Sequence, residues 1–302
     1  MAVTLDGLEV ELPQSWGKTV MKDAFEASVV GSLTNQIPVS TRGNVVPVYE
    51  GGFEVGYTAE AAAKPVSEVG MSLQYLVPNK YAGIVVVSKE AARENPGNMM
   101  EIMRQDMINA VSRQVDYGIF YGRSARTGAP VPNVSSVNST TNRVELAAGD
   151  LVPQFLAGYD LAGEGSDPNG FAFDTRMRTR VSLASQQELS APGGISPMPS
   201  LNTTAGTLGG LKVAYGRTVA GKVGANDPTN VRGFVGDWNK LRWGFSSDIS
   251  LQRSDQATIV DGSGNTYHLF QQNLIAFLVE FEAGWWIDPT AFAAFEEGTA
   301  QG

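Results

Sequence analysis

The chain has no cysteine and only one histidine, His268. Without thiols there are no disulfides, no thiolate nucleophile and no cysteine-ligated metal site. A single imidazole also excludes every mechanism that needs two histidines. No GxSxG sequence is present to expose a nucleophilic serine, so a Ser/His/Asp triad is not predicted. His268 lies among aromatic residues in the segment TYHLF, and we interpret it as structural.

Long apolar runs and a cleavable leader are absent as well. The first residues, MAVTLDGLEVELPQSW, contain no basic region followed by an apolar stretch, which a signal peptide would require. No run reaches the roughly 18 apolar residues of a membrane span. We therefore expect a protein that is made and kept in the cytoplasm, with no membrane partner.

Positive charge is scarce: 22 Lys and Arg face 31 Asp and Glu, for a net charge of −9. Proteins that bind nucleic acid through its phosphates are usually basic, because Lys and Arg displace counterions. The balance argues against a DNA-binding protein but not against a container for DNA. Only 18% of residues are charged, below the usual ~25%, which is expected where much of the surface meets partner subunits.

Phosphate-binding and calcium-binding motifs are missing too. Neither GxxxxGK[ST] nor GxGxxG occurs. Asp261, Ser263 and Asn265 alternate like the start of a calcium loop, but Thr266 replaces its glycine and Gln272 its last glutamate. A plain turn is the better interpretation. No paired-acid motif can be placed either, so we predict no enzyme, no cofactor and no metal.

The first 88 residues indicate an arm followed by a hairpin. Residues 1–38 are predicted to be an arm with one amphipathic helix over 16–33, whose apolar stripe runs from Trp16 through Phe25 to Val29 and Val30. Residues 39–88 contain two extended legs joined by the polar tip AEAAAKPVSEVG. The legs hold too few apolar residues for a core of their own, so we expect the hairpin to project onto a neighbour.

A long helix is predicted to start at Asn95, a good N-cap, with Pro96 in its first turn and Gly122 as its stop. Its roughly 26 residues correspond to about 39 Å. Each fourth residue drifts about 40° round the axis, so the apolar contact should spiral round the helix. The row consists of Met99, Met103, Met107, Val111, Val115 and Ile119.

The remainder alternates short helices and strands. We predict helices over 150–161 and around 179–189, a loop over 191–210, and a tail of strand, turn and strand; strands are expected at 170–174, 211–215, 231–235 and 243–245. Arg176, Arg178 and Arg180 alternate with uncharged residues. An exposed face or an ion-pair strip between subunits is a better interpretation than a local anion site. Trp285 and Trp286 point to opposite faces of a strand, which predicts that both faces are covered.

Several motifs occur together along the chain. Pro78 and Lys80 form a Pro-x-Lys element, VSKE ends a strand at 87–90, and Asp116 and Gly122 lie at the end of the long helix. The segments AEAAAKPVSEV, GTLGGLKV, FVGDWNKLRWGFSSDISL and EAGWWIDPTAFAAF follow at 59–69, 206–213, 234–251 and 282–295. Together these motifs resemble those of the major capsid proteins of tailed bacteriophages, the family with the Hong Kong 97-type fold. Lys212 departs from the pattern, because the family usually has proline there.

The resemblance implies an α+β fold with five parts. These are an N-terminal arm (1–38), an extended β-hairpin loop (39–83), a peripheral domain with a long spine helix (84–130), an axial domain (131–260) and C-terminal strands that return to the peripheral domain (261–302). The arm and hairpin would overlap neighbouring subunits. The candidate contact residues between subunits are Trp16, Phe25, Tyr57, Lys64, Pro65, Arg176 and Arg178.

The implied function is that of a major capsid protein in a virion. Copies would self-assemble as hexamers and pentamers into the icosahedral shell round the double-stranded DNA of a tailed phage, in the cytoplasm of the host. The implied partners are a scaffolding protein supplied in trans, a portal and decoration proteins; DNA would be enclosed without sequence-specific binding.

Two departures from the family concern maturation. The helix already starts near residue 95, which leaves no room for the roughly hundred-residue N-terminal scaffolding region of some members. We therefore expect a separate scaffolding protein, or none, and no large N-terminal cleavage. Other members cross-link a loop lysine to an asparagine near the C-terminus. Lys64 could take the first role, but no asparagine follows Asn273, so we expect noncovalent shells.

Two alternative interpretations of the function stay open. An encapsulin-type compartment shell would share the fold and enclose an enzyme cargo. A phage tail or decoration protein that binds a surface is the alternative from a different class, although the long methionine-lined helix argues against it.

Overall fold

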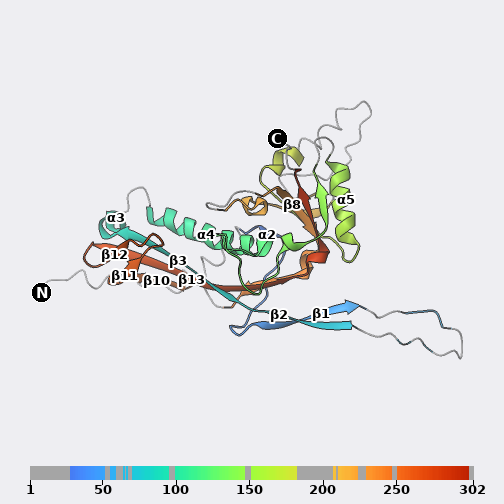
Figure 1. The fold of residues 1–302 in the computed structure, drawn as a ribbon, viewed down its shortest axis with the longest axis horizontal. Coiled ribbons are helices and arrows are strands. Elements are labelled where there is room, and N and C mark those ends of the chain that lie inside the picture. The colour runs from blue at the N-terminus through green and yellow to red at the C-terminus, as the bar shows by residue number, and fades with distance from the viewer. Residues whose placement is uncertain are drawn as a thin grey trace.

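The body of the subunit is built around a four-stranded sheet, a six-stranded sheet and one long helix, and a two-stranded hairpin projects from it (Figure 1). The computed structural model describes residues 28–51, 55–58, 64, 66, 70–94, 99–146, 151–181, 207–208, 210–223, 229–246 and 250–298. The predicted arm before residue 28, the helix start at Asn95 and Pro96, and most of the predicted 179–189 helix and 191–210 loop lie outside these ranges. Among the described residues, none of the helices has the length and apolar character that a membrane crossing needs.

The first sheet is antiparallel and is organised around the 14-residue strand β13. The first part of β13 pairs with β3 on one side and β10 on the other, and its last five residues pair with β9. A small hairpin of β11 and β12 lies near β10 and α3, at the end of the sheet where β13 begins (Figure 1). The elements are β3 (Asn79–Ser88), α3 (Lys89–Glu94), β9 (Leu241–Phe245), β10 (Ser250–Ser254), β11 (Thr258–Val260), β12 (Thr266–His268) and β13 (Leu274–Ile287).

The second sheet has six strands in the order β4-β14-β8-β5-β7-β6. All four residues of β5 are buried, which confirms the predicted buried strand. Helix α5 packs closely on this sheet at Gly158, where a Cβ would lie 2.4 Å from the Phe295 ring. The elements are β4 (Arg143–Glu145), α5 (Val152–Gly163), β5 (Gly170–Phe173), β6 (Thr207–Leu208), β7 (Leu211–Tyr215), β8 (Val231–Gly236) and β14 (Phe292–Glu296), with the 3-10 helices η3 (Val137–Ser139), η4 (Arg217–Ala220), η5 (Trp238–Lys240) and η6 (Pro289–Ala291).

Helix α4 (Met99–Tyr121) confirms the predicted long helix. It ends as expected, because Gly122 has φ +65° and its N–H donates to the Gly118 carbonyl over 2.7 Å. Within the predicted row, Val111, Val115 and Ile119 in the C-terminal half are buried, whereas Met99, Met103 and Met107 are only partly buried. The N-terminal half extends away from the six-stranded sheet (Figure 1), and Ile102 there is 63% exposed. The spiral row is therefore not one continuous buried contact within the subunit.

The hairpin is confirmed, but its second leg is shorter than predicted. Strands β1 (Asn44–Gly51) and β2 (Gly70–Leu76) pair antiparallel and project from the body (Figure 1). The chain then leaves the hairpin at Val77 and Pro78, and β3 joins the sheet of β13 instead. Proline has no N–H to donate to a strand ladder, which explains the break. Leu76 is fully buried against Gly284 of β13 and anchors the base of the hairpin.

The predicted segment boundaries do not coincide with the sheets. The boundary at 83/84 falls inside β3, and the one at 260/261 separates β9 and β10 from their partner β13. The C-terminal strands also divide, because β14 pairs with β8 and β4 of the six-stranded sheet rather than returning with β13. The tryptophan prediction is right for one face only, since Trp285 is buried and Trp286 is partly exposed.

Candidate functional site

One side of the β1–β2 hairpin is an exposed apolar surface. Met71, Leu73 and Tyr75 alternate along β2 and are 66%, 61% and 70% exposed, respectively. Because alternate residues share one face of a strand, they form a row, and the register places Pro47 opposite Leu73 and Val45 opposite Tyr75. We call these five residues the hairpin face. A two-stranded ribbon is only marginally stable alone, so an apolar face of this kind is expected to bind a partner.

The predicted contact residues near the hairpin tip are described only in part. Tyr57 is 98% exposed and Lys64 is exposed as well. Pro65, like Trp16 and Phe25 of the arm, lies outside the described residues. Exposure leaves Tyr57 and Lys64 free to meet another subunit, and that role stays a prediction.

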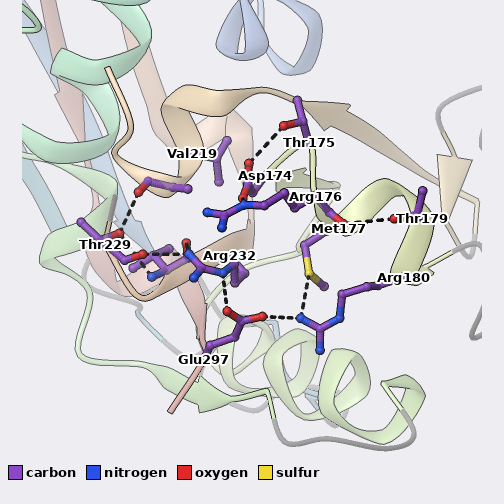
Figure 2. Close-up of polar contacts among 12 residues, drawn as sticks. Asp174, Thr175, Arg176, Met177, Thr179, Arg180, Val219, Thr229, Arg232 and Glu297 are labelled. Carbon is purple, nitrogen blue, oxygen red and sulfur yellow. Dashed lines mark hydrogen bonds and ion pairs between the residues drawn. The ribbon is translucent and has the colours of Figure 1, made fainter. Parts of the chain in front are cut away.

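Arg176 and Arg178 have partners within their own chain. The Arg176 Nε lies 2.7 Å from a carboxylate oxygen of Asp174, which is buried at the end of β5 (Figure 2). The guanidinium of Arg178 lies 4.8 Å from the centre of the Tyr215 ring, a cation–π distance. Both arginine side chains remain exposed, so their contact with another subunit stays a prediction.

Arg180, the third arginine of this row, joins an ion-pair network. The Glu297 carboxylate accepts hydrogen bonds from Arg180 and, over 2.6 Å, from Arg232 (Figure 2). Burial disfavours its charged form, but the bonds and charges of the two arginines outweigh this and hold the pKa of Glu297 below its usual range. The network ties the end of the chain to β8 and to the helical turn after β5.

Asp116 fixes the start of α2 (Val29–Leu33) to the long helix. Its carboxylate accepts hydrogen bonds from the Ser28 hydroxyl over 2.5 Å and from the backbone N–H groups of Val29 and Val30 over 2.9 and 3.2 Å. The two backbone donors are unpaired groups of the first helical turn, which need acceptors. Gly216 admits this helix closely, because a Cβ there would lie 2.1 Å from Val29.

This attachment corrects the prediction for the described end of the arm only. Val29, Val30 and Leu33 are buried against the same chain, not held free for a neighbouring subunit. Farther along, the Ile37 N–H donates to the Trp243 carbonyl of β9 over 2.8 Å. The described end of the arm, residues 28–38, therefore connects the two sheets of one subunit.

The environment of Asp116 changes its acidity. The carboxylate is fully buried, and the loss of water disfavours the charged form more than the three hydrogen bonds favour it. Burial therefore raises the pKa of Asp116 from 3.8 to about 6. The folded subunit holds this proton more tightly than the unfolded chain does.

This shift predicts a pH-dependent stability difference. The folded pKa lies above the unfolded one, so the stabilisation by the proton is complete below pH 3.8 and is lost as the pH rises through about 6. Between these limits we expect the free energy of unfolding to fall by about 3 kcal/mol relative to Asp116→Asn, which has no proton to lose. Urea unfolding of both unassembled proteins across this range measures the difference; parallel stability curves would contradict the assignment.

The turn at 261–265 is confirmed as a plain hairpin turn. The Asp261 carboxylate accepts hydrogen bonds from the backbone of Ser263 and from both the backbone and side chain of Asn265. Its oxygens are thus used within the turn. His268 lies on β12, where its Nδ1 is 3.1 Å from the Thr258 hydroxyl. Among the residues the structure describes, no three His, Asp or Glu side chains group closely enough to hold a metal ion.

Two features of the site were missed from the sequence. The hairpin face has a signal in the alternation of MSLQY, but the same pattern is typical of a strand whose apolar side faces its own core. Asp116 was noted only as part of a motif. Its partner Ser28 lies 88 positions away, a distance at which no local pattern identifies a contact.

Comparison with known proteins identifies relatives over most of the chain. The model of the phage capsid family matches residues 9–297. The probable major capsid protein gp17 of Mycobacterium phage D29 is 27% identical over 284 residues, which cover 88% of this chain and 83% of that protein. The protein of the same name from Mycobacterium phage L5 is 27% identical over 281 residues, covering 86% and 81%. A solved structure from Gordonia phage Cozz superposes with a TM-score of 0.74 at 28% identity, covering 90% of this chain and 87% of that one.

Proposed function

The chain belongs to the phage capsid family, and on that premise we propose that it is a major capsid protein. Copies assemble as hexamers and pentamers into the icosahedral shell that encloses the double-stranded DNA of a tailed phage. The relatives from phages D29 and L5 are named probable major capsid proteins, and this chain matches them over most of their length. The fold is that of tailed-phage capsid proteins, as the sequence motifs implied.

The hairpin face is the observation that connects this function to the residues. A subunit that projects an apolar ribbon beyond its own core has a surface suited to a neighbouring copy (Figure 1). In a closed shell every subunit has such a neighbour, so each copy of the face can be buried. The proposal therefore gives one purpose to an arrangement that would be a liability in a monomer.

The same proposal assigns a role to each part of the subunit. The sheet of β13 with α4 serves as the peripheral domain, and the six-stranded sheet with α5 serves as the axial domain at the centre of each capsomer. Tyr57, Lys64, Arg176 and Arg178, together with Trp16, Phe25 and Pro65, are proposed contacts between subunits. The exposed position of Tyr57 and of both arginines supports this.

The proposed partners are further copies of the chain, a scaffolding protein in trans, a portal and decoration proteins. Assembly takes place in the host cytoplasm, and the mature protein resides in the virion. The family is one of structural capsid proteins, which supports a mechanical role over an enzymatic one. The two alternatives, an encapsulin-type shell and a tail or decoration protein, are not favoured by relatives named as major capsid proteins.

Electron microscopy of the full chain tests the proposal directly. Expressed alone or with a scaffolding partner, the protein should form closed shells or rings of six and five subunits, and sedimentation should show particles far larger than a trimer. Small oligomers that never assemble, even with a scaffolding partner supplied, would overturn it.

A further inference from the structure

A pocket of about 720 Å³ opens between helix α4, the turn after β5 and the 3-10 helix η4. Its size falls within the roughly 300–1,000 Å³ of small-molecule sites. No part of the hairpin face contributes to it. The pocket is thus separate from the hairpin face, although Arg176, a proposed contact between subunits, is among its lining residues.

Four basic side chains from three separate segments line the pocket. Arg113 comes from α4, Arg176 from the turn after β5, and Arg217 and Lys222 from η4 and the residues that follow it. All four are exposed, so their charged groups lie toward the open side. Such a gathering of positive charge is unexpected in a chain with a net charge of −9.

The charges of the pocket are only partly paired, and Arg113 forms an ion pair over 3.4 Å with Asp106, which lies outside the lining. Asp174 also lines it, but its carboxylate is paired with Arg176 over 2.7 Å. Asp116 is occupied by three donors from the start of α2. Within the described part of the chain, neither Arg217 nor Lys222 forms an ion pair. These two cations are therefore available for an anion.

The inner wall of the pocket is polar. Ser112 and Thr218 are each 5% exposed and both contribute to the lining. The Thr218 hydroxyl has no hydrogen-bond partner among the described residues. A buried polar atom without a partner calls for an explanation, and a bound ion or water is a common one.

We propose that this pocket binds a phosphate-type oxyanion. Arginine and lysine together suit a multiply charged phosphate, since arginine presents a fork of N–H donors and lysine a compact charge. The same chemistry could come from free phosphate or pyrophosphate, or from the phosphodiester backbone of enclosed DNA. The segment from Gly216 to Lys222 has the spacing GxxxxGK, but Val223 follows in place of Ser or Thr and the segment folds as η4. The segment is therefore not the phosphate-binding loop of nucleotide hydrolases.

Calorimetric titration of the unassembled full chain with sodium pyrophosphate, at constant ionic strength and neutral pH, tests the proposal. The double variant Arg217→Gln/Lys222→Gln should weaken binding by at least about tenfold. The double variant Arg126→Gln/Arg253→Gln removes the same charge from exposed positions outside the pocket and should bind like the unchanged protein. No binding at millimolar pyrophosphate, or equal losses in both variants, would overturn the site.

A second arm identifies the source of the anion. Inorganic phosphate and a short DNA duplex are each titrated into the same three proteins. Binding of the small anions alone, lost in the pocket variant, assigns the site to free phosphate. Pocket-dependent binding of the duplex as well assigns it to the DNA backbone. Either result is independent of shell formation, because all three proteins are measured before assembly.

Discussion

Leu73→Glu is expected to abolish shell assembly while leaving the subunit folded. Leu73 lies in the middle of the hairpin face, between Met71 and Tyr75 on the same side of β2 and opposite Pro47 of β1. A carboxylate there would have to lose its water when the face is buried by a neighbour, at a cost of several kcal/mol. Every subunit repeats the contact, so the penalty applies to each interface of the shell.

The measurement compares particles with fold. Sedimentation and electron microscopy should show no closed shells for Leu73→Glu, while the free energy of unfolding of the unassembled subunit should change by less than about 0.5 kcal/mol, because the residue is exposed. Gln74→Glu is the matched control: it introduces the same charge one residue along β2, on the opposite side of the ribbon. Normal shells from Leu73→Glu would remove the hairpin face from the assembly interface.

Trp238→Ala is expected to lower the free energy of unfolding by about 4 kcal/mol, the largest loss of stability that we predict. The Trp238 side chain is 1% exposed and packs edge-on against Phe120 of α4 and Phe292 of β14. Its indole N–H donates to the Gly170 carbonyl of β5 over 3.0 Å. One side chain thus holds together the long helix and two strands of the six-stranded sheet.

Trp238→Phe separates packing from hydrogen bonding. Phenylalanine keeps most of the aromatic contact but cannot donate to the Gly170 carbonyl, so we expect a loss of about 1–2 kcal/mol. Urea unfolding of the unassembled subunit gives both values. A loss below about 1 kcal/mol for the alanine variant would show that Trp238 does not join these elements as described.

The two predictions separate assembly from folding because the relevant residues lie in different places. The hairpin face is outside both hydrophobic cores, whereas Trp238 belongs to the core between α4 and the sheets. Asp116 contributes to the stability of the subunit, because it binds Ser28 at the end of the arm. Since burial raises its pKa, this contribution depends on pH. A shell protein needs both core residues that stabilise the subunit and exposed apolar residues that bind its neighbours.

The sequence by itself determined the local elements. The spacing of apolar residues predicted α4, Gly122 marked its end, and the turn residues at 261–265 predicted the small hairpin. The projecting hairpin was predicted for a physical reason, because its legs hold too few apolar residues for a core. The motifs identified the family because they combine short patterns that are weak one by one.

Only the tertiary structure decided which distant segments meet. It placed β14 with β8 and β4 rather than beside β13. It also bonded the backbone N–H groups of Val29 and Val30 to Asp116 and buried their side chains in the core of the same chain instead of on a neighbour. Local periodicity states that a face is apolar but not what covers it, because burial depends on contacts between residues far apart in the chain. The same limit applies to the basic pocket, whose four cations come from three segments between residues 113 and 222 and gather only through the packing of α4, the turn after β5 and η4.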